Sequence, residues 1–116
     1  MRRIIGLVAM LVLFCAPSYA ERKQLTGAEI SAALNGRAVE GTGTPAWRQT
    51  FEADGSTIYT SDRGPEQGRW QVRGDQYCSQ WPPSESWSCY DLAIDGELVI
   101  FIGASGTEHP ARFVPN

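Results

Sequence analysis

The sequence predicts a mainly β domain: an antiparallel meander of seven or eight short strands that closes into a small barrel, with one helix before it. Three observations support this fold class. After residue 36, apolar and polar residues alternate with a period of two through most of the chain. Glycine-containing turns follow one another closely, so neighbouring strands are antiparallel, because parallel strands need a long crossover. Closing the barrel removes the unpaired sheet edges, and a β-sandwich is the alternative.

The first twenty residues have the pattern of a secretory signal peptide. Arg2 and Arg3 precede an apolar run that is too short to span a bilayer stably, and small residues lead up to Ala20. The residue before Cys15 is a bulky phenylalanine, which argues against lipid modification of that cysteine. We therefore expect cleavage after Ala20, no stable membrane anchor afterwards, and a single domain over residues 21–116.

The composition of the mature chain limits its partners. Cleavage removes two of the 10 basic residues, which leaves eight against 13 acidic residues. This balance does not suit non-specific binding of nucleic acid or of an anionic membrane, since both depend on lysine and arginine. We expect a monomeric protein that is secreted or periplasmic and binds no nucleic acid.

One helix is predicted at the start of the mature chain, over residues 27–35. Thr26 can cap it, and Glu29 lies three residues later, where it can complete a capping box. Leu25 and Ile30 are spaced for the hydrophobic staple that often accompanies such a cap. A helix this short is unstable alone, so it must lie against the sheet or close one end of the barrel.

The strands that follow have a consistent inward face. In the first clear strand Trp47, Gln49 and Phe51 share one face, and in a later strand Trp70 and Val72 do so. Asp-Gly and Gly-Asp pairs provide the tight turns between such strands. The pattern therefore predicts which side chains form the core.

The last strand is weaker. It lies near residues 107–114 and contains Pro110, which implies an edge position or a bulge because proline donates no backbone hydrogen bond. His109, the single histidine of the chain, precedes this proline and is expected to be exposed on that edge.

No sequence pattern indicates catalysis or a cofactor. A G-x-S-x-G turn is absent, and one histidine with two cysteines cannot supply the four ligands of a zinc site. Chance pairs are certain among 13 acidic residues, so carboxylate pairs carry no information about glycoside hydrolysis. We assign no catalytic residue, no metal and no cofactor.

The two cysteines of the mature chain predict a disulfide. Cys78 and Cys89 form an even pair in a chain with a signal peptide, which is typical of an oxidising compartment. If residue 78 pairs with residue 89 in a hairpin, the two side chains lie directly opposite each other at a distance that suits the bond. Strand alternation places both on the face away from Tyr77, Trp81 and Tyr90.

The loop between the cysteines, WPPSES, is the candidate binding element. In one interpretation Trp81 plugs the end of the barrel and Trp87 packs on the disulfide, which is favoured because tryptophan is usually mostly buried. In the other, the aromatic side chains form a platform that stacks on sugars or grips a peptide. The candidate binding residues are then Trp81, Pro82, Pro83, Trp87 and Tyr90.

Four functions remain open from the sequence. The first is a non-enzymatic secreted or periplasmic domain that binds an envelope component or a foreign protein. The second is a small-ligand or carbohydrate binder that uses Trp81 and Trp87. A structural envelope protein and a hydrolase are the other two.

The order of motifs resembles that of a known group of proteins. An LTGAEI helix, a W…F..DG hairpin, a G.W.V.GD.YC..W segment and a second cysteine before a final DG hairpin follow one another. This order is similar to that of small secreted proteobacterial proteins of unknown function that are loosely described as lipocalin-like. The resemblance covers most of the mature chain and implies the fold and the secreted location, but no activity. With strands this short, we expect the barrel to be filled mostly by its own side chains.

Overall fold

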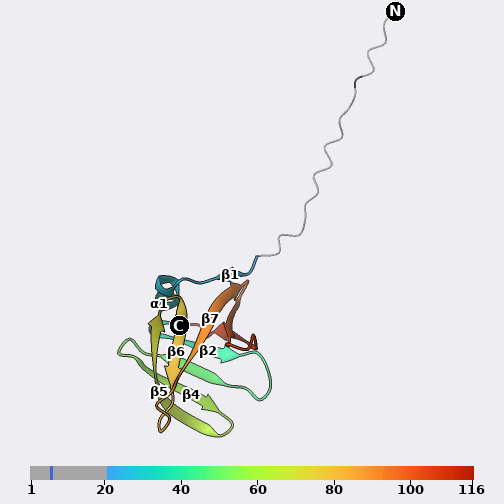
Figure 1. The fold of residues 1–116 in the computed structure, drawn as a ribbon. Helices are drawn as coiled ribbons and strands as arrows, with labels where there is room; N and C mark the ends of the chain where they lie inside the picture. The colour runs from blue at the N-terminus through green and yellow to red at the C-terminus, as the bar shows by residue number, and fades with distance from the viewer. Residues whose placement is uncertain (1–5, 7–20) are drawn as a thin grey trace, which may run out of the picture.

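The computed structural model describes residue 6 and residues 21–116, so the predicted signal peptide, its cleavage site and Cys15 lie outside the described range. The elements follow one another along the chain (Figure 1). They are β1 (Lys23–Gln24), α1 (Gly27–Leu34), β2 (Arg37–Gly41), β3 (Arg48–Phe51), β4 (Ser56–Ser61), β5 (Gly64–Arg73), β6 (Gln76–Gln80), β7 (Trp87–Asp95), β8 (Leu98–Ile102) and β9 (Glu108–Phe113).

Strands β2 to β9 form a closed antiparallel barrel. Each strand pairs with the next along the chain, and β9 pairs back to β2, so the eight strands make one continuous ring. The short strand β1 extends the sheet beside the second half of β7, where Lys23 lies opposite Ile94. The prediction of a mainly β meander that closes into a small barrel with one helix is confirmed.

Strand β9 is not an edge strand, and the prediction of an edge or a bulge at Pro110 is wrong. This strand pairs with β8 on one side and with β2 on the other. The carbonyl of Pro110 accepts from the backbone N–H of Thr42 (3.2 Å), just past the last paired residue of β2, Gly41. In an antiparallel strand the N–H and C=O of one residue point toward the same neighbouring strand. The nitrogen of Pro110, which carries no hydrogen, therefore faces β2 at the place where the β2–β9 pairing ends. Proline therefore costs no ladder hydrogen bond there.

Helix α1 closes one end of the barrel. Its predicted capping box is present: the Thr26 hydroxyl accepts from the Glu29 backbone N–H (3.3 Å), and the Glu29 carboxylate accepts from the Thr26 backbone N–H (3.1 Å). The Gly27 N–H donates to the carboxylate of Asp75 in the β5–β6 turn (2.7 Å). Ile30 and Leu34 are fully buried. The helix thus docks through its apolar stripe at the end where β5 and β6 meet (Figure 1).

The core lies inside the barrel around Phe51. This ring has no exposed surface, and its centroid lies 5.6 Å from that of Trp70, 5.6 Å from that of Tyr77 and 6.3 Å from that of Phe101. The four residues come from β3, β5, β6 and β8, so one aromatic cluster joins strands around the whole ring. The predicted inward positions of Phe51 and Trp70 are confirmed.

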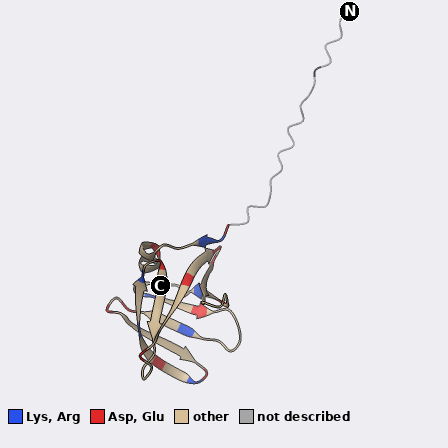
Figure 2. Cartoon of the chain, in the orientation of Figure 1, with Lys and Arg blue, Asp and Glu red and all other residues tan. Residues whose placement is uncertain are grey.

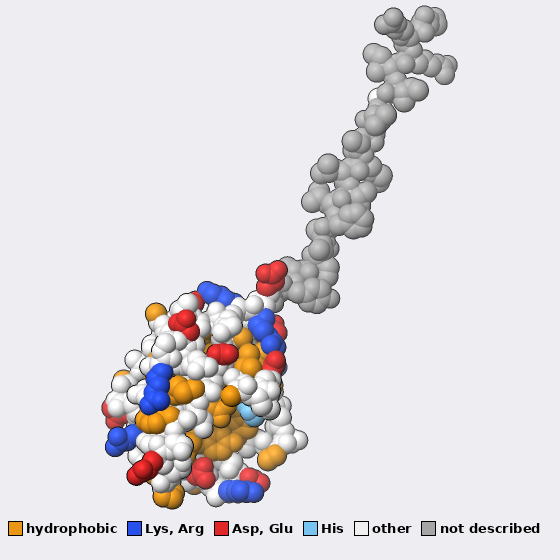
Figure 3. All heavy atoms as spheres, in the orientation of Figure 1, with side chains coloured by type: hydrophobic (Ala, Val, Ile, Leu, Met, Phe, Trp, Pro, Cys, Tyr) orange, Lys and Arg blue, Asp and Glu red, His pale blue; other side chains and the backbone are white. Residues whose placement is uncertain are grey.

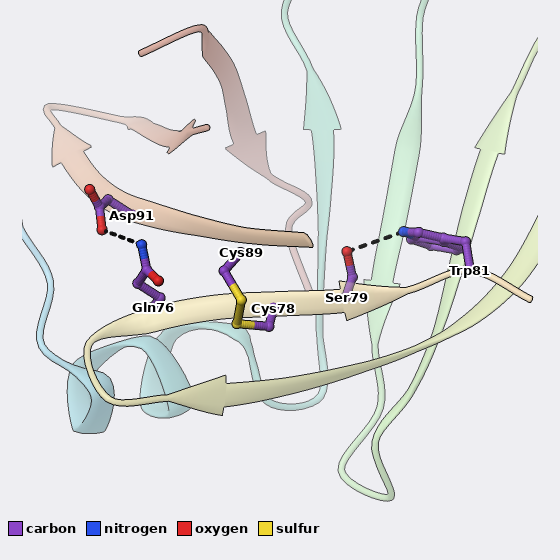
Figure 4. The surroundings of a disulfide bond; sticks show 6 residues. All are labelled: Gln76, Cys78, Ser79, Trp81, Cys89 and Asp91. Carbon is purple, nitrogen blue, oxygen red and sulfur yellow. Dashed lines mark hydrogen bonds between the residues drawn. A yellow bond between two sulfur atoms is a disulfide. The ribbon is translucent and has the colours of Figure 1, made fainter. Parts of the chain in front are cut away.

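The predicted disulfide is present on the outer face. Cys78 and Cys89 are directly opposite each other in the β6–β7 pair, with a Cα–Cα distance of 4.0 Å and an S–S bond of 2.04 Å. Figure 4 shows it beside a hydrogen bond from the Gln76 amide to Asp91 (3.1 Å). The outward side chain of Cys78 is nonetheless fully buried. The bond ties together the two strands that flank the WPPSES loop.

Basic and acidic residues are interspersed along the strands and turns of the barrel (Figure 2). Arg22 forms a two-pronged pair with the Glu108 carboxylate, with both N–O distances at 2.9 Å. Lys23 pairs with Glu29 at 2.6 Å. Residues 21–116 contain no helix with the length and apolarity that a membrane-spanning helix requires.

Candidate functional site

The end of the barrel opposite α1 opens into a cavity of about 280 Å³, which we call the mouth cavity. Strands β3, β5, β7 and β9 begin at this end, and β4, β6 and β8 finish there. Figure 3 shows hydrophobic side chains gathered in a hollow of the barrel surface. The lining residues are Trp47, Gln49, Tyr59, Glu66, Tyr77, Ser79, Trp81, Tyr90, Phe101 and His109.

The expected filling of the barrel by its own side chains is incomplete at this end. Several positions with inward parity carry little or no side chain there, namely Gly41 on β2, Gly68 on β5 and Ser79 on β6. These small residues leave space that larger side chains would occupy. The other half of the barrel is filled by the Phe51 cluster and by the helix residues above it.

Two tryptophans form walls of the cavity because each lies flat over a glycine. A Cβ atom added to Gly68 would lie 2.6 Å from Cε3 of Trp81, and one added to Gly41 would overlap the indole nitrogen of Trp47. Packing an aromatic ring over a strand glycine holds the ring and covers the bare backbone. The Trp81 indole N–H also donates to the Ser79 hydroxyl (3.1 Å; Figure 4). Both walls are therefore held in place without a ligand.

Two tyrosines complete the aromatic walls. The Tyr59 ring stacks on Trp47 at a centroid distance of 5.7 Å and meets Trp81 edge-on at 6.1 Å. The Tyr90 ring contacts His109 edge-on at 6.2 Å. Tyr59 lies in β4 and Tyr90 in β7, whereas Trp47 directly precedes β3 and Trp81 directly follows β6, so the barrel itself sets the spacing of the walls.

The floor of the cavity is polar and buried. Gln49 keeps only 7% of its surface exposed, and its side-chain amide donates to the hydroxyls of Thr57 (3.0 Å) and Tyr77 (2.7 Å). The Thr57 hydroxyl donates to the carbonyl of Thr50 (2.6 Å). Within residues 21–116 the amide oxygen of Gln49 accepts no hydrogen bond. This floor therefore keeps an acceptor that a ligand can use.

Tyr77 supplies a hydroxyl to the same floor. Burial raises the pKa of Tyr77 to about 12, although hydrogen bonds with Ser79 and Gln49 act in the opposite direction. The phenol thus remains neutral throughout the physiological range. Its oxygen accepts from Gln49, so its own proton is available for donation.

The raised pKa of Tyr77 predicts an alkaline loss of stability. A group that keeps its proton longer when folded stabilises the protein below its unfolded pKa of about 10 and loses that contribution as the pH rises through its folded pKa. We expect the wild-type unfolding free energy to fall more steeply than that of Tyr77→Phe between pH ~10 and ~12. Denaturant unfolding across that range measures the difference. Parallel curves for the two proteins would contradict the assignment.

The rim of the cavity carries a negative charge. Glu66 on β5 is directly opposite Tyr59 on β4 and shares the inward parity of Gly68 and Trp70. Burial raises the pKa of Tyr59, and the carboxylates of Glu66 and Asp62 raise it further. None of the ten side chains that line the cavity is a lysine or an arginine. The site is therefore suited to neutral or cationic molecules rather than to anions.

The arrangement offers binding groups rather than an activated nucleophile. His109 and Glu66 both line the cavity, but within the described part of the chain no hydrogen bond joins His109 to a carboxylate or to Ser79. The Ser79 hydroxyl is instead engaged by Trp81. Across residues 21–116 no three histidine, cysteine or acidic side chains lie close enough together to hold a metal ion.

The predicted binding residues divide between the two sides of the sheet. Trp81 and Tyr90 line the mouth cavity. Trp87 and Pro82 instead line a groove on the outside of the barrel, where the Arg73 guanidinium lies 4.7 Å from the centroid of the Trp87 indole. Pro83 is exposed at the tip of the loop. Trp81 and Trp87 therefore do not form one platform.

His109 is also placed differently from the prediction. It is exposed, as expected, but it lies in a strand with two partners and lines the cavity. The sequence likewise does not single out Gln49, Tyr59, Glu66 and Ser79, which also line the cavity. One signal could have found Gln49 and Ser79: they are polar residues on faces that are otherwise apolar and aromatic.

Comparison of the chain with protein-family models, with curated proteins and with solved structures gives no match.

Proposed function

We propose that this protein binds a small organic ligand in the mouth cavity. The observation that carries the proposal is the combination of fixed aromatic walls with a buried polar floor whose hydrogen-bonding groups are not all used. Ligand sites are typically concave and mostly apolar, with a few polar groups that orient the ligand. A core built only for stability would leave neither the space nor the free acceptor of Gln49.

The size of the cavity limits the ligand. A volume of about 280 Å³ lies just below the usual range for drug-sized ligands, ~300–1,000 Å³. It suits a molecule of one or two rings or a short branched chain. Some eight-stranded barrels hold one small ligand, and this likeness is an analogy of fold only.

A periplasmic or extracellular location belongs to the same proposal. The disulfide between Cys78 and Cys89 supports it, because such bonds persist in oxidising compartments. The sequence pattern of residues 1–20 supports it independently. In this setting the protein meets small molecules before they enter the cytoplasm.

The alternative of a protein-binding cysteine loop has less support. Its two tryptophans lie on opposite faces of the sheet, and Trp87 is covered on one side by Arg73. The loop therefore presents mainly prolines, serines and one glutamate to a partner.

Matched tryptophan variants test the proposal. We expect Trp81→Phe to reduce ligand binding strongly, because the larger indole covers Gly68 and binds Ser79, and Trp87→Phe to leave it unchanged. The purified protein is screened by thermal shift against neutral sugars, aromatic heterocycles and organic ammonium salts. A ligand at ~100 times its dissociation constant should stabilise the wild type by about 2.7 kcal/mol. Failure of the whole panel to raise the melting temperature, or equal losses in both variants, would refute the proposal.

A further inference from the structure

The residues that line the mouth cavity also indicate the charge of its ligand. This inference rests on the function proposed above. Its walls include two tryptophans and two tyrosines, Trp47, Tyr59, Trp81 and Tyr90. The face of each such ring is negative, and tryptophan attracts cations most strongly. Such an aromatic side chain attracts a cation most strongly when the cation has lost part of its water shell.

An inward-facing carboxylate stands beside these rings. Glu66 lies opposite Tyr59 in the β4–β5 ladder, and the nearby turn adds Asp62. Burial raises the pKa of Tyr59, and the negative charges of Glu66 and Asp62 raise it further. Glu66 is exposed at the rim of the cavity, where a ligand can reach its carboxylate. Glu66 forms no salt bridge with any of residues 21–116, so no basic side chain of the described chain blocks its carboxylate.

Two basic residues in this part of the fold form no ion pair with Glu66. Arg63 lies in the same β4–β5 turn, but it is exposed and does not line the cavity. His109 lines the cavity, where its ring contacts Tyr90. The site thus combines an unpaired carboxylate with aromatic side chains.

The floor adds a requirement for a polar group on the ligand. The Gln49 amide oxygen is a free acceptor, and the Tyr77 hydroxyl can donate. A ligand with an ammonium head at the rim and a hydroxyl at its other end would use both sets of groups. We propose that the mouth cavity selects small organic ammonium cations, bound by the aromatic walls and Glu66, over neutral molecules of the same shape.

Two probes of equal shape test this selectivity. Choline carries a quaternary ammonium group and a hydroxyl, and its carbon isostere has the same shape with a carbon in place of the charged nitrogen. Dissociation constants are measured from the indole N–H signals of Trp47 and Trp81 in nuclear magnetic resonance spectra of the purified protein. We expect choline to bind at least about tenfold more tightly than the isostere.

Two glutamate variants locate the effect. Glu66→Gln should lower choline affinity about five- to tenfold and leave isostere binding unchanged, because only the ligand with a charge loses an attraction. Glu97→Gln changes the net charge equally, but Glu97 is exposed in the β7–β8 turn at the α1 end, so both affinities should be unchanged.

Other outcomes overturn the selectivity. Equal affinities for the two probes, or an equal effect of both glutamate variants on choline affinity, would show that Glu66 does not make the cavity selective for a positive charge. The thermal-shift panel would then be the remaining test of small-ligand binding. If choline does not shift the indole N–H signals, the proposed selectivity for ammonium cations is refuted. A neutral sugar or heterocycle that binds in the thermal-shift panel would still support the proposed function.

Discussion

Replacing Phe51 with alanine is expected to lower the free energy of unfolding by about 3–5 kcal/mol. The ring is fully buried and lies within 6.3 Å, centroid to centroid, of three other aromatic rings from different strands. Alanine would leave a cavity that these rigid strands cannot close, so the lost contacts add to the lost burial. Denaturant unfolding monitored by circular dichroism measures the change.

Phe51→Leu is the matched control for this prediction. It keeps most of the apolar volume, so its cost should be clearly smaller, and it remains measurable if the alanine variant does not fold. A second comparison uses Ile58→Ala, since Ile58 is 40% exposed on the outer face of β4 and should cost little. A loss at Phe51 no greater than that at Ile58 would contradict the placement of the core.

Removing the disulfide is expected to cost about 2–4 kcal/mol. The Cys78–Cys89 bond closes a loop with a sequence separation of 11 residues and restricts the unfolded chain. The double variant Cys78→Ala, Cys89→Ala avoids leaving a buried free thiol, because Cys78 is fully buried. Its unfolding free energy is compared with that of the wild type under oxidising conditions.

Chemical reduction of the wild type provides the control. If the bond acts mainly on the unfolded chain, reduced wild type and the double variant should have nearly equal unfolding free energies. The native oxidised protein should show no reactive thiol among residues 21–116 before reduction. Two titratable thiols in that range, or a stability unchanged by reduction, would refute the bond.

The alternation of side chains made the barrel predictable. Parity alone predicts the inward positions of Phe51 and Trp70, and it also places Tyr77 on the face opposite Cys78. The Thr26 capping box was equally local. Such features depend on near neighbours in the chain, which a single sequence contains in full.

The closure between β2 and β9 was not predictable in the same way. It joins Val39 to Phe113, positions far apart in sequence, and no local pattern marks that pairing. Pro110 even suggests the opposite, because proline is usually found in edge strands. Here the pairing with β2 ends next to Pro110, so proline is tolerated in a strand with two neighbours. The misplacement of His109 followed from that error.

The mouth cavity was missed because it depends on residues from several strands at one end of the barrel. Gly41 and Gly68 appeared as ordinary strand glycines, whereas each supports a tryptophan from another segment of the chain. Proximity in sequence pairs Trp81 with Trp87, whereas in space its ring lies against Gly68 and Tyr59. Neighbours around a barrel are set by register and curvature, which sequence proximity does not report.

The position of a bound ligand tests the central claim most directly. Intermolecular nuclear Overhauser effects are measured between the protein and the panel molecule that stabilises it most. The proposed function predicts contacts from the ligand to the rings of Trp47, Tyr59 and Trp81, with none to Trp87 on the outer face. Contacts that connect the ligand to Trp87 and Pro82, with the mouth rings unaffected, would contradict it.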